Sequence, residues 1–186
     1  DAARTVAEKT SVGPADIEGR HIGPVVSTTQ FSKIQHLIRG GIDEGATLIA
    51  GGIGRPEGFN HGHFVRPTIF ADVTPDMTIW KEEIFGPVLG SVRVTNDEDA
   101  VRIANDSQYG LGAALWTRDV SKAHKIARQL RAGTVWVNTW LEGHAELSFG
   151  GYKQSGLGRE LGSRAVEEYT EEKSVLFSLG ERQPWW

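Results

Sequence analysis

Strand and helix patterns alternate through residues 88–140, and this order constrains the fold more than any other feature of the sequence. An alternating apolar run at Val88–Val94 predicts a strand, and Asn96 and Asp119 each stand where an N-cap residue would open a helix. Two further strands are predicted at 111–116 and 134–140. Strand, helix, strand, helix, strand is the order of right-handed crossover units. We therefore expect an α/β fold with a mainly parallel open sheet and flanking helices.

The segments on either side of this pattern are shorter. Ser27 and Gln30 fit a capping box, in which Ser27 caps the following helix and the Gln30 side chain reaches back to the helix start. Extended pieces are predicted at 47–50 and 64–70. Near the C-terminus, a partly helical stretch leads to a last strand at Ser174–Leu179, which no following helix covers. Because an uncovered strand pairs readily with another sheet, we expect it to serve as a subunit interface.

The composition excludes several classes of protein. The chain of 186 residues is 39% hydrophobic and 24% charged, with a formal net charge of −4, which argues against a nucleic-acid-binding surface. No apolar run approaches the roughly 20 residues that span a bilayer, and no signal-peptide core is present at the start, so the expectation is a cytoplasmic protein with no membrane partner. The sequence has no cysteine, which excludes disulfides, thiolate metal ligands and a nucleophilic thiol within it.

The stretch Trp80–Val88, Trp-Lys-Glu-Glu-Ile-Phe-Gly-Pro-Val, combines two adjacent carboxylates, an aromatic ring and a Gly-Pro break. Pro87 lacks an N–H and disfavours the helical region for Gly86, so no helix can cross this pair. Residues 82–85 are therefore expected to present their side chains from a loop at the start of a strand, where binding residues tend to lie in open α/β sheets. The alternative is a solvated acidic pair, which is the commoner case for adjacent acids in a loop.

Three stretches together resemble one family. They are Glu-Glu-Ile-Phe-Gly-Pro at 82–87, Gly-Thr-Val-Trp-Val-Asn at 133–138 and Phe-Gly-Gly-Tyr-Lys-Gln-Ser-Gly-Leu-Gly-Arg-Glu-Leu-Gly at 149–162. Their order and spacing resemble the C-terminal portion of the aldehyde dehydrogenase superfamily, from about Gly23 to Phe177. The resemblance implies three parts: a residual helix and linker at 1–24, part of the catalytic α/β domain at 25–158, and a C-terminal helix with the oligomerisation strand at 159–186.

The resemblance implies a cofactor contact in the first stretch. Glu83, the second glutamate of the motif, would accept hydrogen bonds from the nicotinamide ribose hydroxyls of NAD or NADP, and Phe85 would pack near the nicotinamide. The family's dinucleotide-binding domain, which distinguishes NAD from NADP, belongs to segments that this chain does not contain. The glycines at 110–112 and 150–158 lack the spacing of a phosphate-binding loop and are interpreted as tight turns and close packing.

Other positions match the substrate pocket of the family. Asn138 matches a residue close to the active centre, although an amide at a strand end can equally satisfy loop backbone. Phe149 matches a residue that lines the aldehyde tunnel, whereas a lone phenylalanine is more often part of a core. Ser148 stands where the family usually has proline. Trp140 and the acidic residues after it loosely resemble the betaine and amino-aldehyde branch, whose substrates are cationic.

Charged residues near the C-terminus match the subunit interface. Arg159, Glu160 and Glu171 are interpreted as a charge network. By resemblance, Arg159 and Glu171 brace the interface, and Glu160 lies behind the active site as a candidate proton relay. His61 and His63 have no further clustered ligands, so a surface loop is favoured over a metal site.

The implied reaction is the NAD(P)-dependent oxidation of a small-molecule aldehyde to a carboxylic acid. In the family a cysteine thiolate attacks the carbonyl, a hydride passes to the nicotinamide, and water activated by a general base releases the thioester. By motif order, the cysteine and the general-base glutamate fall upstream of Asp1. We therefore expect a homo-oligomeric aldehyde dehydrogenase of which this chain alone is inactive. The alternative is a truncated, non-catalytic paralogue that acts as an oligomerisation or interaction module.

Overall fold

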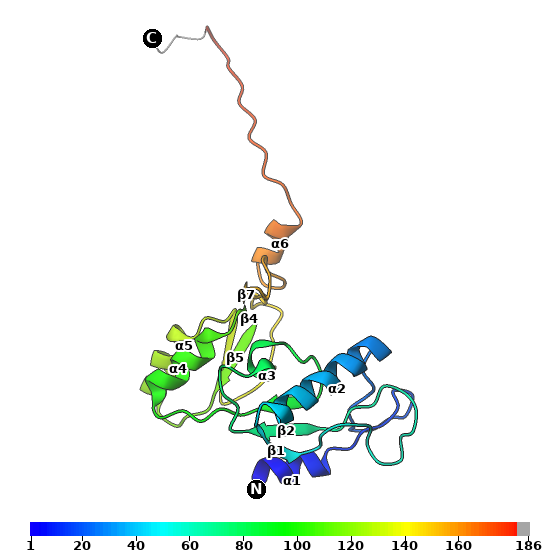
Figure 1. The fold of residues 1–186 in the computed structure, drawn as a ribbon. Helices are drawn as coiled ribbons and strands as arrows, with labels where there is room; N and C mark the ends of the chain where they lie inside the picture. The colour runs from blue at the N-terminus through cyan, green and yellow to red at the C-terminus, as the bar shows by residue number, and fades with distance from the viewer. Residues whose placement is uncertain (182–186) are drawn as a thin grey trace. The chain divides into compact units, whose positions relative to one another are not determined.

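The computed structural model describes residues 1–181, and the chain divides into two compact units (Figure 1). Unit 1 runs from Asp1 to Ile103, and unit 2 begins at Ala104. Helices and strands are mixed in both units, which confirms the α/β class. The predicted division of the chain into a linker, a partial catalytic domain and a C-terminal interface part, with boundaries after residues 24 and 158, stays a prediction. Within residues 1–181, none of the helices combines the length and apolar character needed to cross a membrane.

Unit 1 is built around a three-stranded sheet with the order β1-β2-β3. β1 (Thr47–Ala50) pairs antiparallel with β2 (Thr68–Ala71), and β2 pairs parallel with β3 (Val88–Gly90). β2 is central although Pro67 precedes it, because the ladder begins one residue later with the Thr68 N–H, which donates to the carbonyl of Pro87 at 2.9 Å. The helices of this unit are α1 (Ala2–Lys9), α2 (Thr28–Asp43), α3 (Thr78–Lys81) and the first part of α4 (Asp97–Asp106).

Side-chain caps open three helices at the predicted residues. Ser27, Asn96 and Asp119 each accept a hydrogen bond from the backbone N–H three residues further on, at 3.1, 2.8 and 3.0 Å. Each cap satisfies one of the N–H groups that the first turn of a helix leaves without an intrahelical partner. The starts of α2, α4 and α5 (Val120–Gln129) are therefore set by local sequence.

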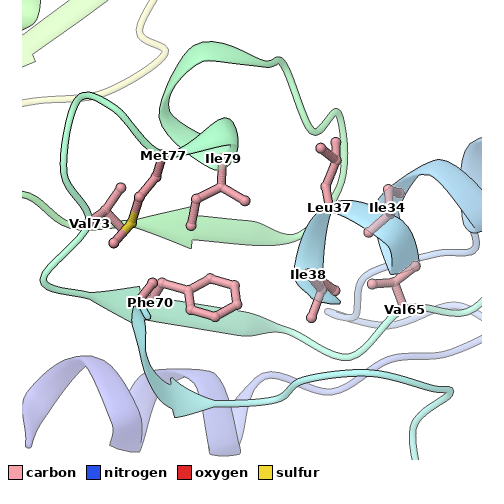
Figure 2. Packing of buried hydrophobic residues seen from close by; sticks show 9 residues of the cluster. Ile34, Leu37, Ile38, Val65, Phe70, Val73, Met77 and Ile79 are labelled. Atoms are coloured by element: carbon pink, nitrogen blue, oxygen red, sulfur yellow. The ribbon is translucent and has the colours of Figure 1, made fainter. Parts of the chain in front are cut away.

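The core of unit 1 packs α2 against β2 (Figure 2). Ile34 and Ile38 of α2 and Phe70 of β2 are completely buried. The helical spacing of the α2 residues places them on one face, and Met77 and Ile79 pack onto the same cluster from α3 and its N-cap. This packing fixes the orientation of α2 within unit 1, and with it the direction of the side chains in its first turn.

Unit 2 contains two two-stranded sheets. β5 (Gly112–Leu115) pairs parallel with β6 (Thr134–Val137), and α5 connects them, which confirms the predicted crossover unit. β4 (Tyr109–Gly110) pairs antiparallel with β7 (Tyr152–Lys153). The helical part of segment 159–170 is α6 (Arg164–Glu168). The strands of residues 1–181 are thus shared among three small sheets instead of one, and the parallel pairs are β2-β3 and β5-β6.

The strand expected at Ser174–Leu179 does not form in the described chain. Residues 171–179 adopt neither helix nor strand, and the side chains of Leu176 and Leu179 are 97% and 98% exposed. A strand exists only through its hydrogen bonds to a neighbour, and in residues 1–181 no strand pairs with this segment. Residues 174–179 therefore stay extended and without strand pairing, although their sequence is apolar and favours a strand. Their pairing with a second subunit stays a prediction.

Candidate functional site

The loop between α3 and β3 carries Glu83 and Phe85, as the Gly-Pro break predicts. α3 ends at Lys81 and β3 begins at Val88, so both side chains project from the loop and not from a regular element. Glu83 is exposed, and the Phe85 side chain is 70% exposed. Phe85 also has a φ of 55°, in the left-handed region that a bulky side chain rarely adopts.

α2 holds this loop from one side. The Gln30 amide nitrogen donates to the carbonyl oxygens of Ile84 and Phe85, both at 3.0 Å. The capping box is therefore only half correct: Ser27 caps the helix, but Gln30 binds the loop instead of reaching back to the helix start. One turn further along α2, the buried Ile34 packs against Gly86 so closely that a Cβ on Gly86 would lie 2.5 Å from its Cδ1.

The two side chains of this loop suit a ribose and an adjoining aromatic ring. A free carboxylate can accept hydrogen bonds from two vicinal hydroxyls at once, and an exposed phenyl ring offers a flat apolar face for stacking. Glu83 and Phe85 are both accessible and stand two residues apart. Within unit 1, the two residues that the family resemblance assigns to the cofactor are therefore both accessible to a ligand, and their role stays a prediction.

Asn138 lies directly after β6, and its side chain is engaged by a neighbouring loop. Its Oδ1 accepts from the Thr117 N–H, and its Nδ2 donates to the Thr117 carbonyl, both at 2.8 Å. The amide thus closes a two-bond ring that links the segments after β5 and β6, and the residue has a φ of 58°. These contacts favour the structural interpretation of Asn138, and its place in an active centre stays a prediction.

Trp140 belongs to an aromatic pair that the sequence analysis missed. Its ring meets Trp136 of β6 edge-on, with centroids 5.0 Å apart and an interplanar angle of 61°. The indole N–H of Trp136 donates to the carbonyl of Glu142 at 2.7 Å, which holds the following loop near the pair. Trp140 is 53% exposed, so part of its ring is available to a ligand. The four-residue separation of two tryptophans across a strand end was the signal available in the sequence.

Phe149 and Glu160 are brought together by backbone pairing. The N–H of each residue donates to the carbonyl of the other, at 2.7 and 2.8 Å, which forms an isolated antiparallel bridge. Both residues line a surface hollow of about 510 Å³ in unit 2. The hollow is also bordered by Arg159, Glu168 and other residues, among them Leu111, Leu157 and Tyr169.

Close glycine packing shapes this region, as predicted for the glycines of 150–158. A Cβ on Gly133 would overlap the carbonyl oxygen of Gly150, and a Cβ on Gly150 would lie 2.6 Å from the carbonyl oxygen of Gly158. Gly156 and Gly158 have φ values of 119° and 80°, which favour glycine. The glycines therefore serve backbone packing and turns.

Arg159 makes a different set of contacts from the predicted charge network. Its guanidinium donates to the carbonyls of Gly151 and Gly158 at 3.0 and 2.6 Å and lies over the Tyr152 ring, and its backbone N–H donates to Glu168 at 3.2 Å. Glu171 is exposed in the extended C-terminal segment. Glu168 is thus the acid that contacts Arg159, and the sequence analysis overlooked it. The interface roles of Arg159 and Glu171 stay predictions.

The histidines of the loop after β1 are bound to neighbouring polar groups. His63 Nε2 lies 2.9 Å from the hydroxyl of Thr28, and His61 Nδ1 lies 2.9 Å from Oδ1 of Asn60. Within residues 1–181, no group of three or more histidine, aspartate or glutamate side chains is placed to hold a metal ion.

Comparison with known proteins assigns a family. A family model described as the aldehyde dehydrogenase family matches residues 1–175. The crystal structure of an aldehyde dehydrogenase from Bartonella henselae is 51% identical with a TM-score of 0.86, and the alignment covers 89% of this chain and 35% of that one. A mutant of aldehyde dehydrogenase C from Pseudomonas syringae, in complex with NAD+ and octanal, is 40% identical with a TM-score of 0.89. That alignment covers 96% of this chain and 37% of the relative.

A third relative is a double mutant of betaine aldehyde dehydrogenase from Staphylococcus aureus, in complex with NAD+. It is 37% identical with a TM-score of 0.90, and the alignment covers 100% of this chain and 38% of that one. The chain thus spans between 35 and 38% of the length of these three relatives. The match to the family model and the likeness to these structures agree with the three motifs. The chain belongs to the aldehyde dehydrogenase family.

Proposed function

We propose that this chain is the C-terminal part of an NAD(P)-dependent aldehyde dehydrogenase that oxidises an aldehyde to a carboxylic acid. The observation that carries the proposal is the match of residues 1–175 to the family, together with an exposed loop that presents Glu83 and Phe85. Relatives bound to NAD+ and to octanal support the reaction class. Because the chain spans about a third of their length, the activity is proposed for the larger protein and not for these residues alone.

Glu83 and Phe85 are the residues that would hold the nicotinamide riboside. Both are accessible, and their chemistry fits two vicinal hydroxyls and an aromatic ring. NAD(P) supplies a hydride acceptor when it is bound. The role of this chain is to orient that acceptor. The Glu83 carboxylate would fix the ribose, and the Phe85 ring would restrict the space beside the ribose. The relatives with bound cofactor named above hold NAD+.

The substrate wall is assigned to Phe149, Trp140 and Asn138. Phe149 lines the hollow in unit 2, and Trp140 is about half exposed. Apolar and aromatic surfaces of this kind exclude water around an aldehyde. Glu160, paired to Phe149 through the backbone, is the candidate for moving a proton at its carboxylate. The betaine and amino-aldehyde branch stays a prediction.

The chain needs another polypeptide segment for catalysis, because it has no cysteine. Ser155 is assigned no catalytic role, and its hydroxyl accepts a hydrogen bond from the Gly110 N–H at 2.9 Å. The purified 186-residue chain should form no NADH from octanal and NAD+. Joining it to the preceding segments of a family member, with their cysteine, should produce NADH. Turnover by the chain alone, in protein free of other dehydrogenases, would contradict the proposal.

The C-terminal segment is proposed to join subunits in a homo-oligomer. Val175, Leu176, Phe177 and Leu179 are between 64 and 98% exposed, so four of the five residues from 175 to 179 are exposed apolar residues. Edge pairing of this segment with a second subunit would cover them and complete its backbone hydrogen bonds. The same exposed segment would also serve the alternative function, in which the chain is a non-catalytic interaction module. The cytoplasmic location expected from the sequence stays a prediction.

A further inference from the structure

We propose that Lys153 is a positioning residue for the aldehyde pocket, because its ammonium group attaches the loop that carries Phe149 to the end of α4. The inference rests on the proposed function of Phe149 as part of the pocket wall. It adds a residue that is not among those lining the hollow and that acts through the backbone.

The ammonium group of Lys153 binds the C-terminal end of α4. Its Nζ donates to the carbonyl oxygens of Asn105 and Ser107 at 2.9 and 2.8 Å, in a partly buried contact. The last carbonyls of a helix have no intrahelical partner, and the partial negative charge of that end favours a cation. α4 has no basic residue in its own last turn, so Lys153 supplies the charge from β7, 46 and 48 residues further along the chain.

The end of α4 is itself fixed. Asn105 Nδ2 donates to the Gln129 carbonyl, and Asn105 Oδ1 accepts from the Arg131 N–H, both at 2.7 Å. These bonds join the end of α4 to the end of α5. Lys153 therefore attaches β7 to a point that two helices share.

Lys153 also has a strained backbone. Its φ of 53° lies in the left-handed region, which is unfavourable for a residue with a Cβ. β7 is two residues long and pairs with Tyr109 and Gly110 of β4, so few ladder bonds hold it. Strained backbone persists only where the surroundings determine it. The two bonds of the ammonium group belong to those surroundings, and β7 should shift without them.

A shift of β7 would reach Phe149. The reciprocal bridge between Phe149 and Glu160 ties the two ends of the glycine-rich loop to each other. This bridge shapes the loop but does not attach it to the rest of unit 2. β7 provides an attachment, and two glycines, Gly150 and Gly151, separate it from Phe149. The place of the Phe149 ring in the hollow therefore depends on Lys153.

The test is the choice between a long and a short aldehyde in the intact aldehyde dehydrogenase that carries this sequence. Lys153→Met removes the charge at similar length. It should lower kcat/KM about tenfold for octanal, whose alkyl chain contacts the pocket wall, and less than about twofold for acetaldehyde. Lys153→Arg, which restores the cation, should keep the selectivity of the parent within about threefold. Lys9→Met, at an exposed lysine of α1, is the matched control and should leave the selectivity unchanged.

Coupling decides whether Lys153 acts through Phe149. In a Phe149→Ala background, Lys153→Met should change the selectivity by less than about twofold, because the ring that it positions is gone. Additive effects of the two substitutions would overturn the inference. Equal losses for both aldehydes would also overturn it, since a general structural defect does not distinguish their chain lengths.

The result for Phe149→Ala separates this inference from the proposed function. If Phe149→Ala keeps the selectivity of the parent, the pocket assignment fails and the role of Lys153 falls with it. If Phe149→Ala loses selectivity and Lys153→Met matches Lys9→Met, only the positioning role is refuted.

A second variant covers a Lys153→Met enzyme that does not fold, as judged by its urea midpoint. Lys153→Gln keeps two N–H donors on a shorter, neutral side chain, and neutral donors bind carbonyls more weakly than charged ones. It should lower the octanal-to-acetaldehyde selectivity about threefold. A folded Lys153→Gln enzyme with the selectivity of Lys9→Met would overturn the inference.

Discussion

The backbones of Phe149 and Glu160 pair through two reciprocal hydrogen bonds, at 2.7 and 2.8 Å, although the residues stand eleven positions apart. The bridge closes the glycine-rich loop between them and places a proposed pocket residue beside a candidate proton relay. Both contacts use backbone groups, so the Glu160 carboxylate is not needed for the bridge. The Glu160 side chain can therefore be substituted without breaking the backbone bridge that closes the loop.

Glu160→Gln in the intact enzyme should lower kcat and alter its pH dependence while stability is preserved. Proton transfer by a positioned side chain typically contributes about 100-fold or more, whereas the backbone bridge survives the change. Steady-state rates across pH, together with urea denaturation, measure the two effects separately. Unchanged kcat at every pH would remove Glu160 from the list of candidate relays.

Asn138→Ala should destabilise unit 2 by about 1–2 kcal/mol, because it removes two hydrogen bonds to the Thr117 backbone. Asn138→Gly removes the same bonds but tolerates the φ of 58°, so it should be more stable than the alanine variant by about 1 kcal/mol. Urea denaturation of both variants gives the comparison. Equal stabilities of the two variants would show that the left-handed backbone at residue 138 carries no strain.

Gly133→Ala should destabilise the protein by about 1–3 kcal/mol, because the new methyl group would overlap the Gly150 carbonyl and force backbone to move. Gly143→Ala is the matched control, since a Cβ there meets no atom within 4 Å. Chemical denaturation should show the control within about 0.5 kcal/mol of the parent. Similar losses in both variants would mean that residue 133 has room for a side chain.

Glu44→Gln should remove part of the dependence of stability on pH. The hydroxyl and the N–H of Thr78 donate to the Glu44 carboxylate at 2.5 and 2.7 Å and hold the pKa of that carboxyl below its usual value of 4.5. The unfolded chain therefore binds the proton more tightly, so stability rises with pH. The stabilisation is complete above about pH 4.5 and is lost as pH falls through the lowered pKa.

The measurement for Glu44 is the urea midpoint of parent and Gln variant from neutral to acid pH. The parent should be more stable at neutral pH, and the difference should shrink below the usual glutamate pKa. Asp76 and Asp99, whose pKa values are also lowered by hydrogen bonds from Thr74 and Arg102 respectively, contribute the same trend in both proteins. A difference that grows on acidification would contradict the assigned direction.

Leu176→Asp combined with Phe177→Asp should shift the intact enzyme toward smaller species. Both side chains are exposed here, at 97% and 79%, and a buried charge at an interface costs more than it gains. Light scattering after size-exclusion chromatography gives the mass of the assembly. Lys173→Glu, an exposed change in the preceding segment that also lowers the net charge by two, controls for altered charge. An unchanged assembly would place the interface elsewhere.

Local sequence determined the starts of three helices, α2, α4 and α5. Ser27, Asn96 and Asp119 cap helices at the predicted places, because an N-cap binds the N–H three residues on and needs nothing distant. The Gly86-Pro87 break likewise placed Glu83 and Phe85 on a loop, since the restriction lies in the two residues themselves. The absence of cysteine, which shapes the whole functional proposal, is also a property of sequence alone.

Only the tertiary structure decided which partner each polar side chain meets. Gln30 had a plausible local partner in the backbone N–H of Ser27, but its side chain instead donates to carbonyls 54 and 55 residues away, and the Asn138 amide binds Thr117. The segment Ser174–Leu179 has strand-like residues but pairs with no strand in the described chain. Short-range preferences are encoded residue by residue, whereas a hydrogen bond or ladder between distant segments exists only once packing has brought both sides together.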